Sequence, residues 1–107
     1  MIRRSVIYKT ATGAEPYADY VDTLKDYAGA AKIRARVTRA KLGNLGAHHG
    51  VGEGVIELKI DFGPGYRIYV GLYGEELIIL LCAGDKSSQD RDILTARDHW
   101  KDYRRSV

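Results

Sequence analysis

Cysteine and histidine are scarce in this sequence. The only cysteine, Cys82, lies in the apolar run LIILLCAG, so no intrachain disulfide can form and the thiol is expected to pack rather than react. The three histidines are scattered, and no set of ligand side chains has the spacing of a metal site. We therefore expect the protein to use no metal and no other cofactor.

Long apolar runs are also absent. No stretch approaches the roughly 20 residues that span a bilayer, and the start MIRRSVIYKTATG has no apolar signal-peptide core. A cytoplasmic protein with no membrane partner is the expectation. The length of 107 residues suits one domain, 1–107, and 45% hydrophobic with 29% charged residues is typical of globular proteins.

Positive charge is unevenly distributed along the chain. The net charge of +3 is modest and does not by itself indicate a nucleic-acid partner. Residues 29–43, however, contain five basic residues and no acidic one: Lys32, Arg34, Arg36, Arg39 and Lys41. One face of the protein is thus expected to attract phosphates in a salt-sensitive way.

The N-terminal half carries strand and then helix signals. Residues 3–8 indicate a short strand. Apolar residues at three- and four-residue spacing predict a helix over 15–27, with Pro16 in its first turn and a break at Gly29. A second apolar stripe predicts a helix that ends at Gly43, and the two helices are expected to pair as a hairpin.

The C-terminal half indicates a sheet followed by a helix. Residues 55–60 and 66–73 alternate with the two-residue period of half-buried strands, whereas residues 77–84 are apolar throughout, as in a strand buried on both faces. Ser87 is an N-cap candidate for a helix whose apolar stripe is Ile93, Ala96, Trp100 and Tyr103. The fold class is α+β, with a small curved, mainly antiparallel sheet, an N-terminal helical hairpin and a C-terminal helix.

Three basic residues are candidates for phosphate chemistry. Lys59 and Arg67 face the same way if their strands form a hairpin, and Arg67 can hold a phosphate with its forked donors. Lys86 follows the apolar strand, where an anion pocket can form. The alternative for Lys59 and Lys86 is that they are solvated surface residues. Arg67 lies in an apolar strand, so it is either paired with a carboxylate or used functionally.

Other residues supply candidates for proton transfer and RNA contact. Glu57, His48 and Asp85 are possible acids or bases, although the adjacent His48 and His49 point opposite ways in a strand, so at most one faces a cleft. Eight tyrosines accompany a single phenylalanine, and tyrosine rings can stack on bases. The expected RNA-binding residues are Lys32, Arg36, Arg39, Tyr66 and Tyr69.

The segments GEGVIELKIDFGPGYRIYV and LLCAGDKSSQDRDI resemble the HigB-like addiction-module killer proteins of the RelE/ParE toxin superfamily. The resemblance covers most of the chain, and GPGYR and GDKSSQD are its most specific parts. It implies a RelE-like fold and an endoribonuclease, an mRNA interferase, that cuts mRNA on the ribosome without a metal. It also matches Lys59, Arg67 and Lys86 to basic site residues, which makes them the candidate catalytic residues. The implied partners are a cognate helix-turn-helix antitoxin, forming a toxin–antitoxin hetero-oligomer, and the ribosome with its mRNA.

Two departures from that pattern keep other functions open. No tyrosine follows the last predicted strand until Tyr103, and no histidine until His99. A ParE-like inhibitor of DNA gyrase, which shares the fold and cuts nothing, therefore stays an alternative. A nucleic-acid-binding module without toxicity is the third, with the basic second helix as its main feature.

Overall fold

The alternating and apolar segments of the sequence form one mixed sheet of five strands in the computed structural model, which describes residues 2–107. The strands are β1 (Arg4–Ile7), β2 (His48–Gly50), β3 (Val55–Ile60), β4 (Tyr66–Tyr73) and β5 (Leu77–Gly84). Their order is β1-β5-β4-β3-β2. β1 runs parallel to β5 and every other pair is antiparallel. The apolar strand β5 thus lies inside the sheet, as its composition predicts.

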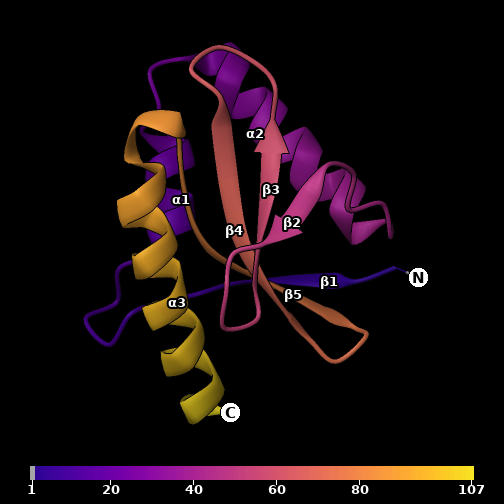
Figure 1. The fold of residues 1–107 in the computed structure, drawn as a ribbon, viewed down its shortest axis with the longest axis vertical. Coiled ribbons are helices and arrows are strands. Elements are labelled where there is room, and N and C mark those ends of the chain that lie inside the picture. Colours follow the sequence, from indigo (N-terminus) through magenta and orange to yellow (C-terminus); the bar gives the residue numbers. More distant parts are fainter. Residues whose placement is uncertain (1) are drawn as a thin grey trace.

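Helices cover both faces of this sheet (Figure 1). α1 (Pro16–Asp22) and α2 (Tyr27–Lys41) pack on one face, and α3 (Gln89–Ser106) packs on the other. Each face therefore has its own apolar cluster, and the larger one lies under α1 and α2. The compact α+β arrangement, with N-terminal helices and a C-terminal helix, agrees with the prediction. None of the helices within residues 2–107 has the length and apolar character needed to cross a bilayer.

The boundary between the first two helices differs from the prediction. The break lies at residues 23–26, and Gly29 is inside the first turn of α2. Asp26 caps α2 by accepting a hydrogen bond from the Gly29 backbone N–H at 2.9 Å. Gly29 is required there for packing, because a Cβ at this position would stand 2.5 Å from the Tyr66 ring. The two helices touch, but α1 packs mainly on β5 and α2 on β3 and β4.

The start of the C-terminal helix also differs. Ser87 is not its N-cap, because a short 3-10 turn, η1 (Lys86–Ser88), precedes α3. The Asp85 carboxylate caps this turn and accepts hydrogen bonds from the Ser87 backbone N–H at 2.8 Å and the Ser87 hydroxyl at 2.5 Å. The N-cap of α3 is Ser88, so the helix starts one residue later than predicted, and Lys86 is left at the end of the sheet.

The apolar stripe of α3 packs as predicted. Ala96 and Trp100 are buried, and Ile93 and Tyr103 pack against the same cluster. Trp100 lies directly over Gly71 of β4, where an added Cβ would stand 2.5 Å from the indole ring. Cys82 is buried beneath α3, and burial raises the pKa of its thiol to about 12. This agrees with a cysteine that packs rather than reacts.

Candidate functional site

A groove lined by basic side chains lies at the end of β3, and we refer to it as the basic groove. It consists of two adjoining cavities of about 550 and 260 Å³ that share Ala47, Lys59, Ile60 and Asp61. Its basic lining residues are Lys32, Arg36, Arg39, Lys59, Arg67 and Lys86. Asp61 is the only acidic residue among the described residues that line it. The groove therefore offers a strongly positive environment to an anion.

Strand pairing explains why the groove opens at this end. β2 pairs only with Ile56, Glu57 and Leu58, so the last residues of β3 have no strand along that edge. The turn that follows, residues 61–65, contains Gly63 and Gly65 at φ of +56° and +81°, a region that favours glycine. Across this turn Lys59 pairs directly with Arg67. The two side chains thus leave the sheet on the same face, as the hairpin argument predicts.

Arg67 is both buried and part of the groove wall. Only 6% of the residue is exposed, and its Nη1 donates a hydrogen bond to the Gly65 carbonyl at 2.5 Å. Its Nε lies 3.8 Å from Oε2 of Glu57. The sequence left open whether this arginine is paired with a carboxylate or available to a ligand. In the structure it pairs with Glu57 and also lines the groove.

Lys59 and Lys86 reach the same cavity from two other directions. Lys59 is exposed near the end of β3, and Lys86 is exposed in η1, after β5. The three residues predicted from the sequence as catalytic therefore line one cavity. Asp85, the neighbouring acid candidate, uses its carboxylate to cap η1.

Glu57 is the centre of a buried polar cluster beside the groove. The side chain is fully buried, and Gln89 of α3 donates a hydrogen bond to its Oε2 at 3.0 Å. Its other oxygen, Oε1, lies 3.2 Å from Nε2 of His49. Tyr69 is buried next to it, and burial, followed by the charge of Glu57, raises the pKa of the phenol. A carboxylate in such a place requires these partners to offset its desolvation.

The two adjacent histidines lie on opposite faces of β2, as strand alternation requires. His49 pairs in register with Glu57, on the same face as Lys59 and Arg67. His48 pairs with Leu58, and its Nδ1 lies 2.7 Å from the Gly46 carbonyl. His49 therefore shares its face of the sheet with Lys59 and Arg67, whereas the acid or base candidate His48 does not, and neither histidine is among the described residues that line the groove. The histidine pair was visible in the sequence, but only the β2–β3 register identifies the member on the same face as these two cations.

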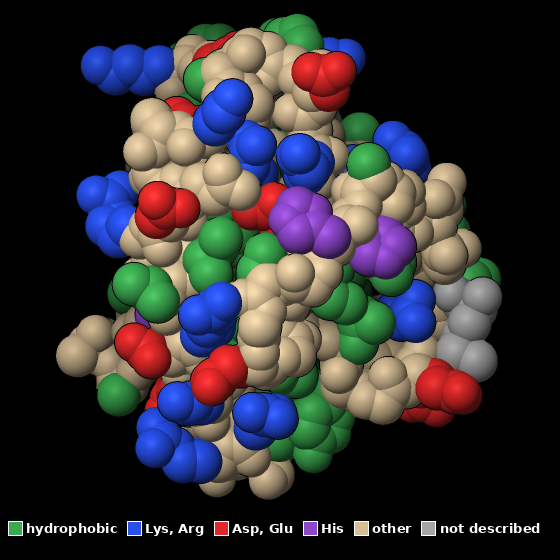
Figure 2. Space-filling model, in the orientation of Figure 1, with side chains coloured by type: hydrophobic (Ala, Val, Ile, Leu, Met, Phe, Trp, Pro, Cys, Tyr) green, Lys and Arg blue, Asp and Glu red, His purple; other side chains and the backbone are tan. Residues whose placement is uncertain are grey.

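The basic residues of α2 have unequal roles. Lys32 lies over the Phe62 ring at 5.0 Å from its centroid, and with Arg39 it extends the groove along the helix. Arg34 pairs with Asp22 at 3.1 Å instead. Figure 2 shows Lys and Arg side chains gathered beside histidine side chains on the face that it presents.

Arg36 was predicted to contact RNA, but its guanidinium is used within the fold. Only 5% of the residue is exposed, and it donates hydrogen bonds to the carbonyls of Leu45, Ala47 and Lys59 at 2.5, 2.8 and 3.2 Å. Burial lowers the pKa of this guanidinium. Arg36 therefore ties α2 to the edge of β3 and fixes the groove wall.

Tyr66 and Tyr69 were also predicted to contact RNA, and both rings are buried. Tyr66 is 3% exposed and its hydroxyl donates a hydrogen bond to Asp26 at 2.6 Å, while Tyr69 is 0% exposed beside Glu57. Neither ring is available to stack on a base in this structure. At Tyr66 the hydroxyl thus supplies a polar contact inside the core, whereas the buried Tyr69 hydroxyl has no hydrogen-bond partner among the described residues.

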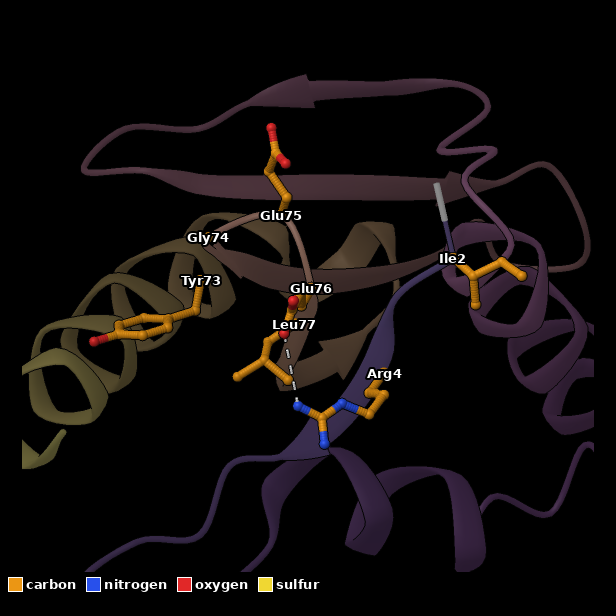
Figure 3. A pocket seen from close by; sticks show the side chains of 7 residues that line it. All are labelled: Ile2, Arg4, Tyr73, Gly74, Glu75, Glu76 and Leu77. Carbon is orange, nitrogen blue, oxygen red and sulfur yellow. Dashed lines mark ion pairs between the residues drawn. The ribbon is translucent and has the colours of Figure 1, made fainter.

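A larger cavity of about 630 Å³ lies between β1 and the β4–β5 hairpin (Figure 3). Its lining includes Glu75 and Glu76 but only one basic residue, Arg4, which lies 3.9 Å from Glu76. This charge pattern does not suit a phosphate. Within residues 2–107, no group of three or more histidine, cysteine or carboxylate side chains is arranged to hold a metal ion.

Comparison with known proteins gives one informative relative. No protein-family model matches the sequence, and no solved structure matches the chain. A protein of Haemophilus influenzae that is described as uncharacterized is 44% identical to this chain over 81 residues. The match covers 76% of this chain and 82% of the relative, so the chain belongs to the same protein family as this H. influenzae protein.

Proposed function

We propose that this protein is the toxin of a type II toxin–antitoxin system, a ribosome-dependent mRNA interferase with a RelE-like fold. The observation that carries the proposal is that Lys59, Arg67 and Lys86 line one cavity. They come from β3, β4 and η1, and the resemblance to HigB-like proteins selects the same three residues. The GPGYR segment forms the turn between two of them.

The chemistry of the groove suits an RNA phosphate. Attack of a ribose 2′-hydroxyl on the adjacent phosphorus places additional negative charge on the phosphoryl oxygens. Arg67 is held in a fixed orientation by Gly65 and Glu57, so its remaining donors are preorganised for these oxygens. Lys59 and Lys86 add mobile positive charges at the rim. In this proposal side-chain cations stabilise the transition state, and no metal ion is required.

The same charge pattern suggests how the toxin is controlled. A cognate helix-turn-helix antitoxin that places acidic residues over the basic groove would neutralise it and exclude the ribosome and mRNA. The active species is then the free toxin, and the stored species is a toxin–antitoxin hetero-oligomer. This partner is proposed from the resemblance together with the basic groove.

Primer extension on a defined mRNA in a purified translation system, with and without ribosomes, tests the proposal. Arg67→Lys keeps a positive charge opposite Glu57, and Lys59→Met changes an exposed residue, so both variants are expected to fold. Both are expected to lose most cleavage. Lys101→Met, which removes an exposed lysine from α3 far from the groove, is the matched control and should cut like the wild type.

Two other outcomes would replace this function. Growth arrest with DNA damage and no RNA cleavage would favour the gyrase-inhibitor reading. Salt-sensitive RNA binding without cleavage or growth arrest would favour a nucleic-acid-binding module. The nucleic-acid-binding module has a specific observation in its favour. The groove continues along α2 through Lys32 and Arg39, as a surface for a nucleic-acid strand would.

A further inference from the structure

We propose that His49 is the general base of the cleavage reaction, with Glu57 as its orienting carboxylate. This inference rests on the proposed function and adds to it the group that takes the proton from the 2′-hydroxyl. The three catalytic candidates Lys59, Arg67 and Lys86 stabilise charge, but ammonium and guanidinium groups are not suited to accept a proton near neutral pH. A histidine is the side chain that most often does so.

The register of the sheet places His49 beside the groove. It lies directly opposite Glu57, and Lys59 is two residues further along β3 on the same face. Such diagonal neighbours have Cα atoms roughly 7–8 Å apart, within reach of long side chains. About half of the His49 side chain is exposed, at 50%, so the ring contacts both the buried carboxylate and solvent.

The contacts of Glu57 divide between its two oxygens. Gln89 and Arg67 approach Oε2, at 3.0 and 3.8 Å, while His49 Nε2 approaches Oε1 at 3.2 Å. Oε1 is fully buried and has no hydrogen-bond partner among the described residues. The His49 imidazole and the buried, unpartnered Tyr69 hydroxyl are the neighbouring groups that can satisfy this oxygen, and in the proposed tautomer His49 does so by donating the Nε2 proton. That interaction leaves Nδ1 as the nitrogen able to accept a proton.

This arrangement favours a base over an acid. A carboxylate that contacts Nε2 stabilises the imidazolium that forms when Nδ1 takes up a proton. The titratable and charged groups on the sheet beside the pair are Lys59, Arg67 and Tyr69, and Cys82 and Asp92 lie around Tyr69. Of these, Arg67 places a positive charge 3.8 Å from Oε2 of Glu57, the carboxyl oxygen that His49 does not contact.

The reaction then balances without a further reactant. The proton of the 2′-hydroxyl moves to Nδ1 of His49, the O2′–P bond forms, and the P–O5′ bond breaks. The 5′-oxygen takes a proton from solvent, and deprotonation of the imidazolium by water restores the enzyme. The products are a 2′,3′-cyclic phosphate and a 5′-hydroxyl.

Single-turnover cleavage of mRNA on ribosomes, measured from about pH 5.5 to 8.5 around the ordinary histidine value, tests the assignment. His49→Gln is expected to slow cleavage by about 10²–10⁴-fold and to remove the rise of rate with pH that a base produces. His48→Gln changes the adjacent residue on the opposite face and should retain the wild-type rate and profile. A His49→Gln protein that cuts at the wild-type rate, in an assay where Arg67→Lys is inactive, would overturn the role of His49 and leave the proposed function standing. Absence of cleavage by the wild type would overturn both.

Two further measurements separate a base from other roles. A substrate with sulfur in place of the bridging 5′-oxygen has a leaving group that needs no protonation. His49→Gln should remain slow on it, whereas restored cleavage would show that His49 acts as the acid.

Imidazole NMR titration requires no activity: Glu57→Gln should shift the His49 resonances and leave those of His48 in place. Unchanged His49 resonances would refute the pairing on which the assignment depends.

Discussion

The face of the sheet that α3 covers has two unlike ends. At one end, Val55, Gly71 and Ile79 are paired in register and lie under or near Trp100, and this region is apolar. At the other end, Lys59, Arg67 and Gly84 form the corresponding row, and Gly84 lies against the first turn of α3, where an added Cβ would stand 2.0 Å from the Asp92 carboxylate. Along β3 and β4 this row thus changes from Val55 and Gly71 to the cations Lys59 and Arg67 within four residues, whereas β5 ends in an uncharged glycine.

This difference separates the residues that stabilise the fold from the residues that the fold presents to a ligand. Burying apolar area at the Trp100 end stabilises the domain with no polar cost. The other end buries Glu57 and most of Arg67, a pairing that apolar side chains of similar size often replace without loss of stability. Charge in that position therefore favours a functional explanation. Four predictions test or sharpen this contrast.

The largest effect on stability is expected at the apolar end. Trp100→Ala removes a 4% exposed ring that packs over Gly71 and stacks with Tyr103. It should lower the free energy of unfolding by about 3–5 kcal/mol in urea denaturation. Leu94→Ala, an exposed position on the same helix, should change it by less than about 0.5 kcal/mol. Equal effects of the two variants would refute the packing role of Trp100.

At the charged end, the loss of stability caused by a substitution depends on which member of the Arg67–Glu57 pair is left unpaired. Arg67→Ala should lower the free energy of unfolding by about 3 kcal/mol, because Glu57 stays buried without its cation. Adding Glu57→Gln removes the stranded charge and should recover part of this loss. Urea denaturation of the single and double variants measures the coupling. A double variant whose loss equals the sum of the two single losses would mean that Arg67 and Glu57 do not interact.

An exposed cation of the groove should affect RNA binding and not stability. Lys59→Met removes one phosphate contact, so the salt dependence of binding to a single-stranded RNA should lose a slope of about 0.7. The urea midpoint should stay within error of the wild type. Fluorescence anisotropy over a salt series gives the slope. Lys101→Met is the matched control, and an equal change in it would show that binding is not localised to the groove.

The strands were predictable from the sequence because their signal is local. Alternation in residues 55–60 and 66–73 gives β3 and β4, and the pairing of Lys59 with Arg67 follows from the short turn between them. The helix boundary at residues 23–26 was not, because Gly29 packs against Tyr66, a residue distant in sequence. By local rules Gly29 indicates a helix break, but in the tertiary structure it lies inside α2 and makes a close contact with the Tyr66 ring.

The basic residues of the candidate site were predictable from the sequence, but the buried polar contacts of the site were not. Strand alternation and strand ends make Lys59, Arg67 and Lys86 candidates, and the resemblance to HigB-like proteins selects them as the expected site residues; the structure places all three in the lining of one cavity. The role of His49 depends on the register of β2, an edge strand of three residues with little sequence signal. The burial of Arg36 depends on the carbonyls of residues 45–47, which no local pattern indicates. Polar groups that satisfy one another across elements are visible only once the elements are placed.

The smallest effect concerns the opposite side of β4, where Tyr66 points away from the groove toward α2. Its hydroxyl and the Gly29 N–H both donate to Asp26, and these hydrogen bonds lower the pKa of the carboxyl below its usual 3.8. The stability that they provide is present above pH 3.8 and is lost as pH falls through the lower folded-state pKa. Asp26→Asn should therefore lower the Tm at pH 7 by a few degrees, and the difference should shrink as the solution is acidified. Tyr66→Phe removes the same donor and should make the Asp26→Asn effect smaller. If instead the Tm difference between Asp26→Asn and the wild type persists at low pH, the hydrogen bonds of the charged carboxylate are not its cause.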